Sequence, residues 1–95
     1  MVVKGWNNGG STFGIKIGVA DRAAFFERSW KQIVLVIDDV GHEISLTDAF
    51  WAKCSELRSP AIRDWLGRHG KLVWPSGNPP RFTLEPLGGA RFRLV

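Results

Sequence analysis

The sequence has one cysteine, no tyrosine and no long apolar run among its 95 residues. A single cysteine excludes an internal disulfide, and two histidines beside it are too few for a Cys-rich structural zinc site. The longest apolar run, Ile33 to Ile37, is far too short to cross a bilayer. No apolar segment follows the first residues, so a secretory signal is not predicted. We therefore expect a cytoplasmic protein with no cofactor and no association with a membrane.

Motifs of catalysis are also missing. The sequence contains no serine elbow, no H-E-x-x-H and no phosphate-cradling loop. Cys54 lies on the apolar side of a predicted helix, where a free cysteine behaves as a small buried hydrophobe. His69 ends a predicted helix, a position that favours capping of carbonyl groups over action as a base. The sequence thus gives no reason to predict an enzyme.

One turn gathers residues of the types that bind metals: Asp38, Asp39, His42 and Glu43. Aspartate and glycine are favoured in turns by backbone chemistry alone. Oxygen-only sites also need more ligands than this loop presents. No metal site is predicted, although the sequence leaves open whether this turn binds an ion.

Length and composition indicate one globular domain over residues 1–95. A chain of 95 residues with 44% hydrophobic content is long enough for one conventional core and too short for two. Five tryptophans supply much buried area for so small a protein. The residues expected to lead the core are Trp30, Ile33, Leu35, Phe50, Trp65, Phe82 and Phe92.

Alternating apolar residues and turn signals predict three β-hairpins, near residues 2–19, 32–47 and 81–95. In the first hairpin, Asn7-Asn-Gly-Gly10 forms the turn, and Gly14 and Gly18 on one face of the second strand indicate a bulge or a close backbone approach. In the last hairpin, the apolar residues stay on one face only with a three-residue loop. That register places Glu85 opposite Arg91 or Arg93.

Helical periodicity predicts three helices, at about 21–30, 48–57 and 60–69. In the first, Phe26 and Trp30 face inward as an i,i+4 pair. In the second, Phe50, Cys54 and Leu57 recur at i, i+4 and i+7. The third begins with a capping residue followed by proline. Together these elements predict an α+β fold with a mainly antiparallel sheet of about five to seven strands.

The order of elements from Asp21 onward (helix, strand, helix, helix, hairpin) resembles that of winged-helix domains. The resemblance covers about two thirds of the chain. It implies that the helix at 60–69 reads nucleic acid and that the terminal hairpin is the wing. An open β-barrel with helices inserted between hairpins fits the strand count as well, and it too can carry nucleic acid on a basic face. Both stay open as alternatives.

Charge is divided unevenly along the chain. Residues 58–95 carry seven Lys or Arg against two acids, a net +5, whereas residues 21–57 carry four against seven, a net −3. Arginine binds phosphates through a planar fork of donors. Asp64 is spaced to pair with Arg68 along the helix and to neutralise part of this charge. The predicted nucleic-acid-binding residues are Arg63, Arg68, Lys71, Arg81, Arg91 and Arg93.

The leading hypothesis is a non-enzymatic intracellular binding protein whose Arg-rich C-terminal face contacts DNA, RNA or another polyanion. The alternative is a module for protein interaction or self-association that uses Trp74 and the Pro-rich loop 75–80. Aromatic residues are enriched at interface hot spots, and an ordered loop loses little entropy on binding. The residues of this alternative site are Trp74, Pro79 and Pro80. A structural role competes with it, in which Trp74 covers the core where the chain passes from helix to sheet.

Overall fold

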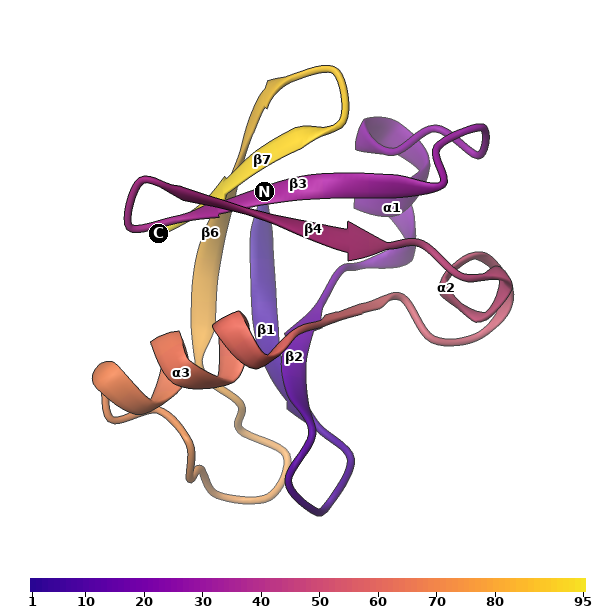
Figure 1. The fold of residues 1–95 in the computed structure, drawn as a ribbon. Coiled ribbons are helices and arrows are strands. Elements are labelled where there is room, and N and C mark those ends of the chain that lie inside the picture. Colours follow the sequence, from indigo (N-terminus) through magenta and orange to yellow (C-terminus); the bar gives the residue numbers. More distant parts are fainter.

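Seven strands form one bent sheet in the computed structural model, which describes residues 1–95 (Figure 1). The strands are β1 (Val2–Asn7), β2 (Phe13–Lys16), β3 (Gln32–Ile37), β4 (Val40–Ser45), β5 (Glu56–Arg58), β6 (Arg81–Gly88) and β7 (Arg91–Leu94). The helices are α1 (Val19–Phe25), α2 (Asp48–Ala52) and α3 (Pro60–Arg68).

The sheet is an open barrel. Its strand order is β4-β3-β7-β6-β1-β2-β5, and only the β3–β7 pair is parallel. In Figure 1, β3 and β4 cross the direction of β1 and β6, so the sheet folds over on itself. The edge strands β4 and β5 do not pair with each other, which leaves the barrel unclosed. This architecture confirms the predicted α+β class with a mainly antiparallel sheet, and it fits the open-barrel alternative.

The core lies inside the folded sheet. Five of the seven residues expected to lead it are buried, namely Ile33, Leu35, Phe50, Trp65 and Phe92. Trp30 and Phe82 are half-buried and pack against the core. Phe92 stacks on Phe26, with the two ring centroids 4.6 Å apart. Trp30 also meets Phe92 edge to face, with centroids 6.3 Å apart, so two aromatic contacts join β7 to the segment after α1.

Two helix boundaries differ from those predicted. α1 ends at Phe25 rather than near residue 30, although Phe26 and Trp30 still meet edge to face with centroids 6.1 Å apart. α2 ends at Ala52 rather than near residue 57. The cause is tertiary, because residues 56–58 pair with β2 and form β5. A helical apolar pattern is here overridden by non-local strand pairing.

Strand β5 separates α2 from α3, and this overturns the winged-helix resemblance. A helix-turn-helix needs two helices joined by a short turn, whereas a strand of the sheet lies between these two. α3 begins as predicted, with Pro60 first and the Ser59 hydroxyl accepting a hydrogen bond from the N–H of Ala61 at 3.2 Å. None of the three helices has the length and apolar character that a membrane crossing demands.

The β1–β2 hairpin turns at the predicted Asn-Gly segment, but Asn7 pairs with Phe13, so the loop runs from Asn8 to Thr12. The predicted close approach is present at Gly14 and absent at Gly18, where the nearest atom to a Cβ would be 3.9 Å away. Asn8 Oδ1 accepts a hydrogen bond from the N–H of Gly10 at 2.9 Å, and Gly9 has a φ of +83°, which favours glycine. A Cβ on Gly14 would lie 2.3 Å from the carbonyl oxygen of Leu57. Glycine therefore lets β5 lie against β2 at this point.

The β6–β7 hairpin places Glu85 opposite Arg93, one of the two predicted partners. The loop differs from the prediction, because Gly88 pairs with Arg91 and leaves a two-residue turn. A bulge at Leu87 accompanies this shorter turn. The bulge supplies the residue that the shorter turn removes, so the apolar residues still share one face.

Candidate nucleic-acid interface

Three cationic side chains lie in register on the outer face of neighbouring strands. Lys4 on β1 is opposite Arg81 on β6 and opposite Lys16 on β2. Val3, which precedes Lys4, is buried, so Lys4 points to the outer face. All three cations are exposed. Opposed side chains on adjacent strands have Cβ atoms roughly 5 Å apart. The row Arg81–Lys4–Lys16 therefore concentrates positive charge across three strands.

No carboxylate neutralises this row. The structure has three ion pairs, none of which includes a residue of the row: Arg58–Glu56, Arg68–Asp38 and Arg93–Glu85. Glu56 on β5 is the cross-strand partner of Lys16. Its carboxylate, however, is buried and bound to Arg58. Like charges directly opposite one another destabilise a sheet, so the row favours an anionic ligand.

Trp6 and Arg58 lie beside the row. Gly14 is opposite Trp6 on one side and opposite Arg58 on the other. Because Gly14 has no side chain, the guanidinium reaches across β2 to the indole, and its Cζ lies 4.6 Å from the ring centroid. We call this group the cationic face, and its residues are Lys4, Trp6, Lys16, Arg58 and Arg81.

Arg58 also binds the carboxylate of Glu56. Its Nη2 donates to Oε1 at 3.1 Å, and the side chain of Glu56 is 3% exposed against 50% for that of Arg58. A buried carboxylate that lost its cation would destabilise the fold strongly. The ion pair is therefore maintained, and it holds the Arg58 guanidinium in place. With Trp6 on its other side, the guanidinium is ordered before any ligand arrives, which lowers the entropy cost of binding.

A second arginine lies close to Arg58 at the start of α3. Arg58 and Arg63 both line a hollow of about 260 Å³. The hollow also has three hydroxyl groups, from Ser11, Thr12 and Ser59. Guanidinium and hydroxyl groups gathered in this way suit a phosphate. The structure thus brings Arg63, one of the predicted nucleic-acid residues, next to the cationic face.

The three predicted hairpin arginines are not gathered in one place. Arg81 belongs to the cationic face. Arg93 is opposite Glu85, four residues along β6 from Arg81, and hence roughly 13 Å away. Arg91 lies still farther along the hairpin, opposite Gly88. The three arginines project from the same side of the hairpin, but they are too far apart along it to form one binding site.

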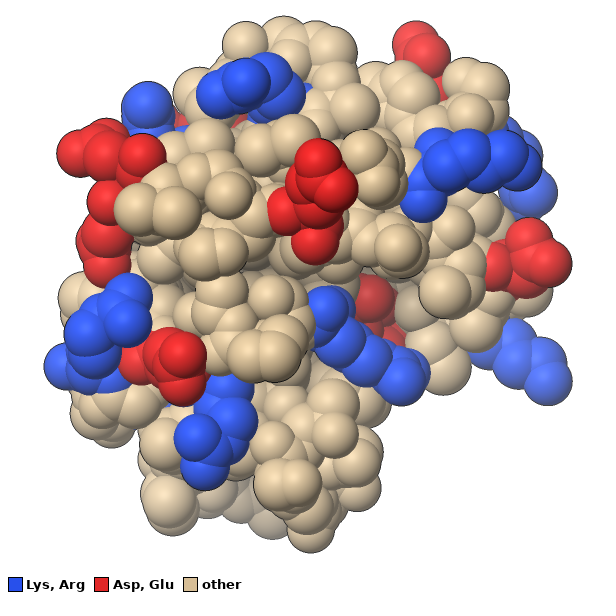
Figure 2. Space-filling view, viewed as in Figure 1, with Lys and Arg blue, Asp and Glu red and all other residues tan.

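The two remaining predicted basic residues also lie outside the face. Nη2 of Arg68 donates to Asp38 in the β3–β4 turn at 2.9 Å, whereas the prediction paired Arg68 with Asp64. Lys71 is exposed beyond the end of α3. Figure 2 shows blue and red side chains interleaved over the side of the molecule that it draws. On that side the charges do not form one basic patch.

Trp74, Pro79 and Pro80 lie beside the cationic face. Trp74 is half-buried and meets Phe13 edge to face, with centroids 6.3 Å apart. The carbonyl of Pro80 accepts a hydrogen bond from the N–H of Gly5 at 2.8 Å. These contacts give the segment a structural role at this end of the core. Trp74 and Pro79 also line a hollow that opens onto the cationic face.

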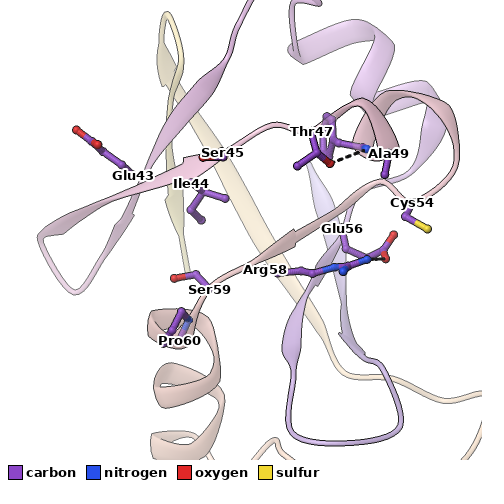
Figure 3. A pocket seen from close by; sticks show the side chains of 11 residues that line it. Glu43, Ile44, Ser45, Thr47, Ala49, Cys54, Glu56, Arg58, Ser59 and Pro60 are labelled. Atoms are coloured by element: carbon purple, nitrogen blue, oxygen red, sulfur yellow. Dashed lines mark hydrogen bonds and ion pairs between the residues drawn. The ribbon is translucent and has the colours of Figure 1, made fainter.

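Another hollow, of about 370 Å³, lies at the gap between the edge strands β4 and β5 (Figure 3). Glu56 and Arg58 line it from β5, and Glu43 lines it from β4. Cys54 also lines it, half-buried after the end of α2 and not within a helix as predicted. The chain has no group of three or more His, Cys, Asp or Glu side chains placed to hold a metal ion.

Arg58 was not among the predicted binding residues, and neither were Lys4, Trp6 and Lys16. Two signals point to the last three: residues 1–20 contain no acid, and the alternation in β1 places Lys4 and Trp6 on one face. The pairing of β1 with β6 has no local signal, because it joins residues that are distant in the chain.

Comparison with protein-family models, with curated proteins and with solved structures gave no match to this chain. The geometry of the cationic face is therefore the basis on which a function can be proposed.

Proposed function

We propose that this protein binds nucleic acid through the cationic face and that it is a binding protein rather than an enzyme. The observation that carries the proposal is the row Arg81–Lys4–Lys16, in which the opposed cations form no ion pair with a carboxylate. Repulsion across such a row opposes folding when no ligand is bound. A polyanion lying across the three strands would remove that repulsion.

The composition of the face favours nucleic acid among polyanions. Lys4 and Lys16 supply point charges that attract phosphates irrespective of base sequence. Arg58 presents planar donors beside the indole of Trp6. That combination suits a ligand that has both phosphates and flat aromatic bases. A cytoplasmic location, predicted from the sequence, is part of the proposal.

The test is the binding of fluorescently labelled oligonucleotides, measured by anisotropy at low salt and then at rising salt. Phosphate contacts release counterions, so the logarithm of the association constant should fall linearly with the logarithm of salt concentration. For three contacts the expected slope is about −2 to −3. Absence of binding at low salt, for single-stranded and double-stranded oligonucleotides alike, would refute the proposal.

A matched pair of triple variants separates the cationic face from net charge. The first variant combines Lys4→Gln, Lys16→Gln and Arg81→Gln. The control combines Lys31→Gln, Lys53→Gln and Arg91→Gln, at exposed residues outside the face. Both lower the formal charge from +4 to +1. We expect the first variant to lose affinity roughly tenfold or more and the control to lose little. Equal losses would mean that only net charge matters.

Self-association through Trp74 and the loop 75–80 is the second hypothesis. One observation favours it, since Val73 beside Trp74 is 91% exposed and leaves apolar surface there. The contacts of Trp74 with Phe13 and of Pro80 with β1 weaken it. Light scattering over a range of concentrations distinguishes the outcomes. A rising mass that Trp74→Ala abolishes would favour self-association, and a constant monomer mass would count against it.

A further inference from the structure

A hollow of about 400 Å³ opens between the cationic face and the segment that leads from α3 to β6. Its wall includes two indoles, two ammonium groups, an amide and a proline ring, from Trp6, Trp74, Lys4, Lys16, Asn7 and Pro79. Aromatic rings and cations therefore meet at one place. Surfaces that bind single-stranded nucleic acid combine these two kinds of group.

Both indoles are held by contacts within the protein. The guanidinium Cζ of Arg58 lies 4.6 Å from the ring centroid of Trp6. Trp74 meets Phe13 edge to face at a centroid distance of 6.3 Å. Each indole is half-buried, so part of each remains accessible from the hollow. Rings that are already ordered lose little entropy when a ligand group stacks on them.

Asn7 adds a hydrogen-bonding group to the wall. Its Oδ1 accepts a hydrogen bond from the N–H of Gly9 at 2.8 Å, which orients the side-chain amide. The NH₂ group of the same amide is then left as a donor. Bases present ring nitrogens and carbonyl oxygens that accept from such a donor. The hollow thus offers stacking surfaces, a donor for a base edge and charges for the adjoining phosphates.

We propose that this hollow receives an unpaired base, so that the ligand of the cationic face is single-stranded nucleic acid. The inference rests on the proposed function. An indole stacks only on a base whose flat face is exposed, and the bases of a duplex are covered by their neighbours. Lys4 and Lys16, which line the hollow, would contact the phosphates on either side of that base. A duplex could use the cations but not the indoles.

The position of the cations also favours a single strand. Proteins that read duplex DNA insert a helix or a β-ribbon into the major groove. The row Arg81–Lys4–Lys16 instead lies on the outer surface of the sheet. α3 is the longest helix, and it turns Ile62, Trp65 and Leu66 into the core. Near the face it contributes Arg63, at its first turn.

The experiment compares a single-stranded oligonucleotide with the duplex of the same sequence, at one salt concentration and with the full chain. We expect the single strand to bind about tenfold more tightly. In Trp6→Leu, affinity for the single strand should fall about tenfold, because one stacking surface is lost. Affinity for the duplex should fall much less, through the loss of order in Arg58, and its salt dependence should stay the same because every cation is kept.

Trp51→Leu is the matched control. Trp51 is also half-buried beside an arginine, with the Cζ of Arg28 at 5.3 Å from its ring centroid, and it lies outside the hollow. We expect this variant to bind both forms of the oligonucleotide as the unaltered protein does. Equal effects of Trp6→Leu and Trp51→Leu would mean that the hollow has no special part in binding.

A second measurement uses the unaltered protein, so it does not depend on the folding of a variant. A single-stranded oligonucleotide that contains bromouracil is irradiated in the complex, and peptide mass spectrometry locates the cross-link. We expect the cross-link at Trp6 or Trp74. Cross-links confined to other residues, or equal affinity for single strand and duplex, would overturn the inference and leave the proposed function standing. Absence of binding to either form would refute both.

Discussion

The outer surface of the sheet differs between its two halves. On β1, β2 and the start of β6, one row of opposed residues consists of cations alone: Arg81, Lys4 and Lys16. Across β4, β3, β7 and the end of β6, Arg93 is opposite Glu85, and Val34 lies between Arg91 and Glu43. We call this second group the mixed face, and its residues are Val34, Glu43, Glu85, Arg91 and Arg93.

The comparison shows that the number of arginines is a poor guide to where an anion binds. The mixed face has two arginines, but Glu85 neutralises one of them and an apolar residue separates the other from Glu43. The cationic face has charges that oppose folding while it is empty. Residues that lower the stability of the fold are expected at functional sites, where binding or catalysis requires them.

The largest effect is expected at Gly14, which connects the cationic face to β5. In Gly14→Ala, the added Cβ would lie 2.3 Å from the carbonyl oxygen of Leu57, so β5 must move. Because a backbone atom is the obstacle, we expect the free energy of unfolding to fall by about 3 kcal/mol. Urea denaturation followed by circular dichroism measures the change.

Gly18→Ala is the control for this substitution. The nearest atom to a Cβ at Gly18 is 3.9 Å away, and its φ of −61° suits any residue. The expected change is about 0.5 kcal/mol or less. Equal losses for Gly14→Ala and Gly18→Ala would contradict the close contact between β2 and β5.

The same substitution in the two halves should have different costs. Arg58→Gln leaves the buried carboxylate of Glu56 without its cation, and we expect a loss of about 2 kcal/mol, less than for a fully buried pair because Arg58 is half-exposed. Arg93→Gln breaks an exposed pair whose charged atoms are 4.0 Å apart, at a cost of about 0.5 kcal/mol or less. Chemical denaturation of both variants at one pH makes the comparison.

A double variant identifies the source of the loss. Glu56→Gln combined with Arg58→Gln removes the buried charge together with its partner, so it should be more stable than Arg58→Gln alone. If the double variant is no more stable, the lost free energy comes from the contact between Arg58 and Trp6.

Removing one charge from the row should stabilise the protein and weaken binding. Lys16→Gln ends the repulsion between Lys16 and Lys4, for a gain of roughly 0.5 kcal/mol. It should also make the slope of the logarithm of the association constant against the logarithm of salt concentration shallower by about 1, the share of one phosphate contact. Added salt should shrink the gain, since screening relieves the same repulsion in the unaltered protein. Thermal unfolding and anisotropy check the two signs, and a loss of stability would show that the row is not repulsive.

The fold class was predictable because local sequence patterns, such as alternation and turn residues, indicate most of the strands and helices. Alternation in the last hairpin was enough to place Glu85 opposite Arg91 or Arg93, since a shift of one residue would turn apolar residues outward. The pairing with Arg93 is known from the structure. The end of α2 was not predictable in this way. Phe50, Cys54 and Leu57 fit a helical period, yet residues 56–58 gain more by pairing with β2. That gain depends on residues about forty positions earlier, which no local period contains.

The candidate site was predictable only in part, because its members are distant in the chain. Charge alone pointed to Arg63 and Arg81. Lys4 and Lys16 form the other part of the row. They are opposite each other because the loop runs from Asn8 to Thr12, a register that the Asn-Gly turn signal does not give. Arg81 joins them only through the pairing of β1 with β6, a contact that folding of the whole barrel creates.

The smallest effect is expected at Arg68, a predicted nucleic-acid residue that lies outside the cationic face. Asp38→Asn breaks the ion pair between Arg68 and Asp38. Because both side chains are more than half exposed, the free energy of unfolding should change by about 0.5 kcal/mol or less. Asparagine also suits the positive φ of 49° in this turn. The control, Asp39→Asn, adds the same charge beside it without breaking an ion pair. If nucleic acid passed over Arg68, freeing that guanidinium would raise affinity in Asp38→Asn alone. We expect the two variants to bind alike in anisotropy titrations, because the ligand lies on the cationic face.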